Sequence, residues 1–96
     1  MHITKQLTEI NCRFFEAMEA LAGLGWINSL SSFCAEHNLS APRYREMRLT
    51  YGMSKKTNPK PPRYKSVEID ALYYLCNIYS ISAEWLLTGK GKMFKD

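Results

Sequence analysis

The sequence predicts an all-α domain, a compact five-helix fold with an extended first helix. Apolar residues recur every three or four positions through most of the 96-residue chain, which is the spacing of one helical face. Three of the four prolines fall in one short segment, so the rest of the chain is free to be helical. No segment makes a convincing strand, and the length fits a single domain over residues 1–96.

The first predicted helix runs from Thr4 to about Leu24. Thr4 is a suitable N-cap, and Gly23 and Gly25 end the pattern. A helix of about 20 residues is ~30 Å long, more than so small a domain needs to cover its core. We therefore expect its N-terminal half to pack on a second copy of the chain. Its apolar face consists of Ile3, Leu7, Ile10, Phe14, Met18 and Leu21.

Two short helices joined by a tight turn are predicted over about residues 29–50. Asn28 or Ser29 caps the first helix, and Ser40 caps the second. The turn between them contains Asn38, and asparagine tolerates the left-handed conformation of tight turns. The second helix is basic on its outward side. This is the pattern of a helix-turn-helix unit.

The second half of the chain begins with a basic, proline-rich loop over residues 52–65. Its centre, KKTNPKPPRYK, is too rich in proline for a helix or a central strand. A fourth helix is expected to start at Ser66. The last helix, AEWLL, is short, with Ser82 as its N-cap and Gly89 at its end.

The net charge of +4 is distributed very unevenly. Residues 41–65 carry eight Lys and Arg and one Glu, whereas acidic residues outnumber basic ones both before and after this block. A concentrated positive block favours a polyanionic partner, because each cation placed near a phosphate releases condensed counterions. A solvated basic loop without a partner is the alternative interpretation.

Several classes of protein are disfavoured. No apolar stretch approaches the ~18–20 residues of a membrane span, and the N-terminus lacks the pattern of an export signal. The three cysteines are widely spaced, which suits a reducing cytoplasm. Cys34 and His37 lie one helical turn apart, but Cys34 falls on an apolar face and no further His or Cys lies nearby. We expect a cytoplasmic protein with no membrane partner, metal, cofactor or catalytic activity.

Two segments, FCAEHNLS at residues 33–40 and ISAEWLLTGKG at residues 81–91, resemble the lambda-repressor-like helix-turn-helix regulators of phage and bacterial genomes, the phage-repressor or XRE type. The resemblance covers about residues 28–91. Within it, Asn38 stands where the family usually has glycine, and Leu30 stands where the family often has glutamine.

The resemblance implies sequence-specific binding of double-stranded DNA by a small transcriptional regulator, with the second short helix in the major groove. Arg43 and Arg45 are the expected base contacts, since a guanidinium bridges O6 and N7 of guanine. Arg43 is expected to point outward. The expected phosphate contacts are Asn38, Ser40, Arg48, Tyr51, Lys55, Lys56, Lys60, Arg63 and Lys65. One such helix reads only about 4–5 base pairs, so we expect a homodimer, formed through the first or last helix.

Three alternatives remain open. Arg45 and Arg48 can instead form ion pairs with Glu46 or Glu36. The chain can be a protein-interaction module of the antitoxin or adaptor type that docks through its long first helix. Whether Phe14, Phe15 and Met18 are buried in the monomer discriminates between this role and a role of these side chains in the core. RNA binding is a third possibility, with Tyr44 and Tyr51 as stacking platforms.

Overall fold

A computed structural model describes residues 4–52 and 63–95, and this part of the chain is all-helical. The prediction of an all-α fold is confirmed. Within these residues the only extended pairing is an isolated antiparallel bridge between Ile81 and Phe94. The helices are α1 (Lys5–Gly23), α2 (Leu30–Glu36), α3 (Ala41–Tyr51), α4 (Ile69–Ile78) and α5 (Ala83–Thr88).

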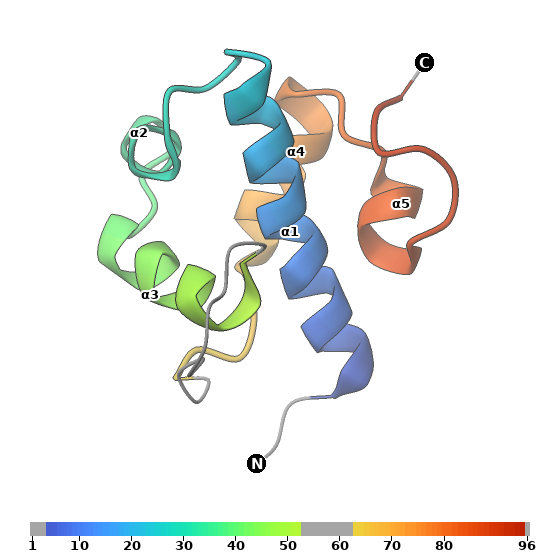
Figure 1. Cartoon of the computed structure of the whole chain (residues 1–96), viewed down its shortest axis with the longest axis horizontal. Coiled ribbons are helices and arrows are strands. Elements are labelled where there is room, and N and C mark those ends of the chain that lie inside the picture. Colours follow the sequence, from blue (N-terminus) through green and yellow to red (C-terminus); the bar gives the residue numbers. More distant parts are fainter. Residues whose placement is uncertain (1–3, 53–62, 96) are drawn as a thin grey trace.

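The long helix α1 runs through the middle of the molecule (Figure 1). In that view α2 and α3 lie on one side of it, α5 on the other and α4 behind it. Phe14 and Phe15 are both almost fully buried, so the apolar face of α1 is wide enough to pack against helices on more than one side. None of the described helices combines the length and the apolarity that crossing a membrane requires.

Side-chain caps fix the starts of four helices. The hydroxyls of Thr4, Ser40 and Ser82 accept hydrogen bonds from backbone N–H groups three residues further on, at 3.1, 3.3 and 3.2 Å. At α2, Ser29 and Ser32 form a reciprocal capping box. These caps satisfy backbone donors that have no partner inside the helix. The predicted N-caps Thr4, Ser29, Ser40 and Ser82 are confirmed.

The predicted start of the fourth helix is wrong by three residues. The sequence predicts that this helix starts at Ser66, but α4 begins at Ile69, with Glu68 as its N-cap residue. Residues 65–67 lie outside the helix because side chains from α1 and α3 bind their backbone groups, as described below. Hydrogen bonds from distant helices have replaced those that a longer α4 would form.

The turn between α2 and α3 has the conformation that the sequence predicts. Asn38 adopts a φ of 60°, in the left-handed region that asparagine tolerates better than most residues. The N–H of the next residue, Leu39, donates to the carbonyl of Cys34 at 2.8 Å and closes the end of α2. Two short helices are thus held in a fixed relation by a turn over residues 37–40.

The chain after α5 folds back on the helices. Backbone hydrogen bonds link Ser82 to Met93 and Lys95 to Ser80, and the ring of Phe94 packs edge-on against Trp26. Arg13 of α1 donates through Nε to the carbonyl of Leu86 at 2.8 Å. A cation at the carbonyl end of a helix is favourable, so Arg13 joins α1 to α5 electrostatically as well as by packing.

Candidate nucleic-acid interface

One side of helix α3 is buried in the core, and the other side is exposed to solvent. Tyr44, Met47 and Tyr51, spaced three and four residues apart, are buried. The exposed residues of α3 are Pro42, Arg45, Arg48 and Leu49. Because the buried residues fix the rotation of the helix about its axis, these four side chains form a defined outward face.

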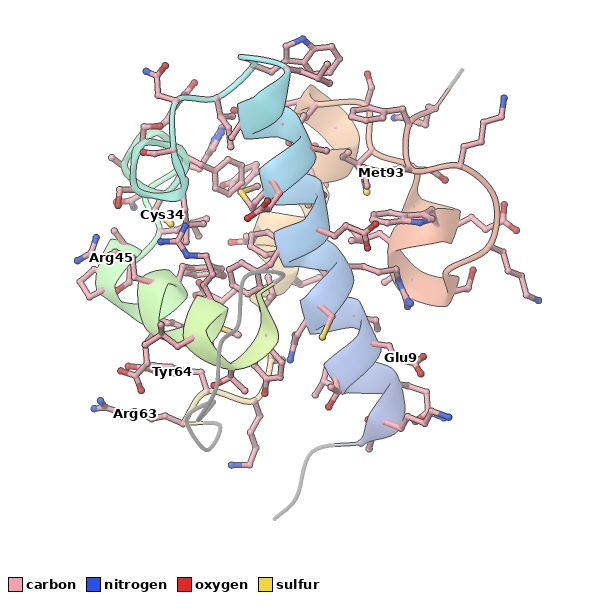
Figure 2. All side chains as sticks on the ribbon, in the orientation of Figure 1. Glu9, Cys34, Arg45, Arg63, Tyr64 and Met93 are labelled. Carbon is pink, nitrogen blue, oxygen red and sulfur yellow. The ribbon has the colours of Figure 1, made fainter. Side chains whose placement is uncertain are left out.

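Arg45 lies on that outward face. Figure 2 shows its side chain projecting from α3 away from α1, on the same side of the molecule as Arg63. Its Nη1 donates to the hydroxyl of Ser31 on α2 at 3.1 Å. This exposed hydrogen bond leaves the other guanidinium donors available to a ligand. The candidate Arg45 is therefore exposed on the outward face of α3.

Arg43 is placed differently from the prediction, and its expected outward orientation is wrong. Its guanidinium Nη2 donates to the carbonyl of Ser66 at 3.1 Å, and its Cζ atom lies 4.8 Å from the centre of the Tyr64 ring. The Nε atom is buried and has no hydrogen-bond partner among the residues that the structure describes. Arg43 precedes Met47 by four residues, so it borders the buried face of α3 and turns towards the chain that packs there.

Tyr51 is also oriented inward, contrary to its expected role as a phosphate contact. The side chain is 4% exposed, and its hydroxyl donates to the carbonyl of Tyr64 at 3.2 Å. Tyr44 is fully buried and its hydroxyl is 2.9 Å from a carboxylate oxygen of Glu68. Neither ring offers the open face that base stacking needs, which removes the basis for the RNA-binding alternative.

The remaining predicted phosphate contacts on α3 and its turn lie at the surface. Asn38 and Ser40 are exposed beside the start of α3. The side chain of Arg48 is exposed and makes no hydrogen bond or ion pair with any other residue that the structure describes. Arg48 belongs to the outward face on which Arg45 lies, and Asn38 and Ser40 lie next to that face, at the start of α3.

The end of the basic loop is fixed beside α3. Arg63 forms an ion pair with Glu46 of α3, with 3.3 Å between Nη1 and Oε1, so Glu46 is paired with the loop and not with Arg45 or Arg48. The side chain of Arg63 is 70% exposed, and Lys65 is half-buried. The predicted contacts Lys55, Lys56 and Lys60 lie outside the described residues.

Residues 64–68, which we call the anchored segment, are held by side chains from α1 and α3. Asn11 of α1 is fully buried; its Nδ2 donates to the carbonyl of Lys65 at 2.9 Å, and its Oδ1 accepts from the N–H of Val67 at 3.0 Å. The hydroxyl of Tyr44 accepts from the N–H of Glu68 at 3.1 Å. With Arg43 and Tyr51, these contacts fix the segment that carries the basic loop back into the fold.

Sequence reasoning missed Asn11, although a signal was present. Asn11 follows Leu7 by four residues and precedes Phe14 by three, so it lies on the apolar face of the first helix. A buried amide requires hydrogen-bond partners, and an asparagine in that stripe indicates backbone groups packed against it. The sequence prediction also did not include Pro42 and Leu49, the two uncharged residues of the outward face of α3, because only charged and polar side chains were considered as contacts.

Cys34 and His37 do not form a nucleophile and its base. Cys34 is fully buried, and desolvation raises the pKa of its thiol to about 11, so the thiol is protonated at neutral pH. The Nε2 atom of His37 lies 3.0 Å from the hydroxyl of Tyr79, and its ring stacks on Tyr74. Over residues 4–52 and 63–95, no group of three His, Cys, Asp or Glu is placed to hold a metal ion.

The three side chains that bear on docking through the long first helix are buried. Phe14, Phe15 and Met18 are at most 5% exposed in the monomer. These three side chains are part of the hydrophobic core. A protein partner that docks on α1 would have to contact other residues of that helix.

Comparison of the chain with protein-family models, curated proteins and solved structures finds no match. The resemblance to lambda-repressor-like regulators thus stays a prediction from the residues, and the function has to be argued from the site.

Proposed function

We propose that this protein binds double-stranded DNA sequence-specifically, as a small transcriptional regulator that inserts α3 into the major groove. The observation that carries this proposal is the outward face of α3, where Arg45 and Arg48 are exposed beside a turn with exposed Asn38 and Ser40. Arg63 is held at the edge of the same helix by Glu46. Cations grouped on one exposed helix are what a major-groove reader requires.

In the proposed complex, base edges are read from α3. The helix has 11 residues and is therefore about 16 Å long. Its diameter with side chains, about 10–12 Å, matches a major groove about 12 Å wide. Arg45 exchanges the Ser31 hydroxyl for the O6 and N7 acceptors of guanine. Leu49, which is 50% exposed, and Pro42 offer apolar contacts suited to a thymine methyl group.

Phosphate contacts surround this reading face. In this proposal Arg48 and Arg63 contact phosphates, with Asn38 and Ser40 as neutral donors at the turn. The anchored segment gives this arrangement its precision, because the hydrogen bonds of Asn11 and Tyr44 fix the residues that follow Arg63. When a cationic side chain on an ordered backbone binds a phosphate, less conformational entropy is lost than when the side chain belongs to a free loop.

The proposal is tested by fluorescence anisotropy on a pool of random duplexes, titrated with salt and followed by sequencing of the bound fraction. We expect affinity to fall steeply with salt, because bound cations displace counterions with a slope of about 0.9 per phosphate contact. We also expect enrichment of one site. Salt-sensitive binding without enrichment would contradict sequence-specific recognition, and no binding at low salt would contradict DNA binding altogether.

We further propose that the protein acts as a homodimer through the apolar groove between α4 and α5. The groove is lined by Ile69, Leu72, Tyr73, Cys76, Ala83, Leu86 and Leu87. Ile69, Tyr73 and Leu87 are 78, 59 and 50% exposed, which is unusual for side chains of this size unless a partner covers them. A two-fold pair of α3 helices would read two half-sites roughly 34 Å apart.

Replacing Ile69 with glutamate is expected to abolish the dimer without unfolding the monomer. Ile69 is the first residue of α4 and is 78% exposed, so a carboxylate there faces solvent and suits the positive end of the helix dipole. In the dimer the same carboxylate would be desolvated without a partner. Sedimentation equilibrium measures the mass, with Leu24→Gln as the matched control at an exposed position outside the groove. A wild-type protein that is monomeric at high concentration would contradict the proposal.

A further inference from the structure

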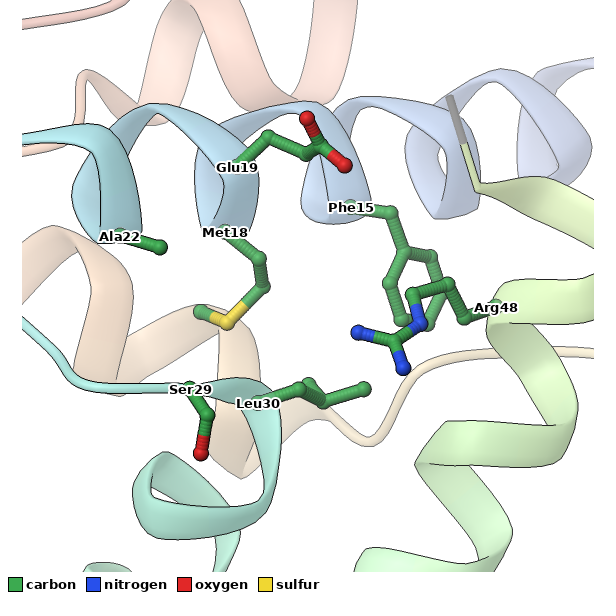
Figure 3. Close-up of a pocket in the computed structure, with 7 residues that line it drawn as sticks. All are labelled: Phe15, Met18, Glu19, Ala22, Ser29, Leu30 and Arg48. Atoms are coloured by element: carbon green, nitrogen blue, oxygen red, sulfur yellow. The ribbon is translucent and has the colours of Figure 1, made fainter. Parts of the chain in front are cut away.

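A second cavity lies on the opposite flank of the core, between α1, the start of α2 and α3 (Figure 3). Its volume is about 230 Å³. Phe15, Met18 and Leu30 converge on it from α1 and α2, and the guanidinium of Arg48 enters from α3. The cavity thus joins the core to the edge of the outward face of α3.

The walls of this cavity are apolar and fixed in place. Phe15, Met18 and Leu30 are 1, 5 and 5% exposed, so each is held by core packing around most of its surface. Their remaining surface faces the cavity. A rigid apolar wall of this kind favours a hydrocarbon group, because burial removes apolar surface from water without ordering the protein further.

The rim of the cavity carries one charge of each sign. Glu19 of α1 and Arg48 of α3 both line it and are both exposed. In the described part of the chain, neither side chain is engaged in an ion pair or a hydrogen bond with another side chain. A ligand that carries only a carboxylate would be attracted by Arg48 but repelled by Glu19. A ligand that carries only an ammonium group would be attracted by Glu19 but repelled by Arg48.

We propose that this cavity binds a free α-amino acid with an apolar side chain. The ligand's carboxylate binds Arg48, its ammonium group binds Glu19, and its side chain packs on Phe15, Met18 and Leu30. The volume fits this class of ligand. It exceeds the ~150 Å³ of a cavity that admits benzene and is below the ~300 Å³ at which typical drug-sized pockets begin.

Ligand binding at this site does not require DNA binding, but it would affect DNA binding through Arg48. Arg48 is also a proposed phosphate contact, so a ligand carboxylate and a DNA phosphate would compete for one guanidinium. By thermodynamic linkage, each would lower the affinity for the other by the same factor. Ligand binding is measured without DNA, so its failure and the failure of DNA binding are separate results.

The experiment is a titration of the ¹⁵N-labelled protein with L-leucine, followed by the backbone amide shifts of the cavity residues. We expect saturable shifts at Phe15, Met18 and Leu30. Glycine, which lacks the apolar group, 4-methylpentanoate, which lacks the ammonium, and 3-methylbutylamine, which lacks the carboxylate, are each expected to bind about tenfold more weakly or worse. Equal binding by any of these three, or no saturable shift with leucine, would overturn the proposal.

Two charge-neutralising variants identify the rim contacts. Arg48→Gln and Glu19→Gln are each expected to weaken leucine binding by about tenfold or more, since a charge-assisted hydrogen bond is lost. Lys90→Gln and Glu9→Gln make the same charge changes at exposed positions away from the cavity, and leucine affinity should not change. Thermal unfolding checks that all four variants fold. Leucine binding that survives both rim substitutions would assign the ligand to another site and overturn the proposal.

Discussion

Replacing Arg45 with alanine is expected to weaken binding to the selected DNA site by about 1–3 kcal/mol and to relax selection at one base pair. Arg45 is the exposed guanidinium nearest the centre of the outward face of α3, and its hydrogen bond to Ser31 lies at the surface. A bidentate arginine–guanine contact discriminates against the wrong base by an amount of this order. Anisotropy on the selected site and on single-base variants of it measures both effects.

Arg43→Ala is the informative comparison, because it removes the same charge two residues away. Arg43 donates to the Ser66 carbonyl and packs on the ring of Tyr64, so its loss is expected to cost about 1–2 kcal/mol of folding stability and to leave base selection unchanged. Lys90→Ala serves as the control for lost charge alone. If Arg43→Ala relaxed a base position and Arg45→Ala did not, the assignment of the outward face would be wrong.

Replacing Asn11 with leucine is expected to lower the free energy of unfolding by about 3 kcal/mol. The substitution removes both hydrogen bonds that Asn11 makes to the anchored segment, and it leaves the part-buried carbonyl of Lys65 and the buried N–H of Val67 without these partners. Each unsatisfied buried group costs roughly 1–3 kcal/mol, and the added apolar surface offsets part of the loss. In a domain of this size, the midpoint of thermal unfolding should fall by roughly 12 °C or more.

Gln6→Leu on the same helix makes the same change from amide to leucine at an exposed position, and its stability should stay within about 0.5 kcal/mol of wild type. Urea titration of both variants separates the local effect from any change in the unfolded chain. An Asn11→Leu variant as stable as the control would show that the hydrogen bonds of Asn11 do not stabilise the anchored segment.

The sequence by itself determined the local features of this protein. Thr4, Ser29, Ser40 and Ser82 cap helices because a short hydroxyl side chain reaches the free N–H groups of its own first turn. Asn38 turns the chain between α2 and α3 because few other side chains tolerate its φ of 60°. The spacing of apolar residues fixed which side of each helix is buried, and with it the all-α fold class. Every one of these features depends on residues within about four positions of each other.

Only the tertiary structure decided where the side chains at the border of a buried face point. Arg43 and Tyr51 turn inward because residues 64–66, which lie 13 or more positions further along the chain, pack beside α3 and present backbone carbonyls to them. Ser66 does not start a helix because Asn11, 54 positions before Lys65, binds the backbone on either side of it. A helical pattern gives the direction of each side chain from its own axis, but it contains no information about which distant backbone groups will be adjacent. Buried backbone groups require hydrogen-bond partners, and in the folded chain the nearest side chains supply them.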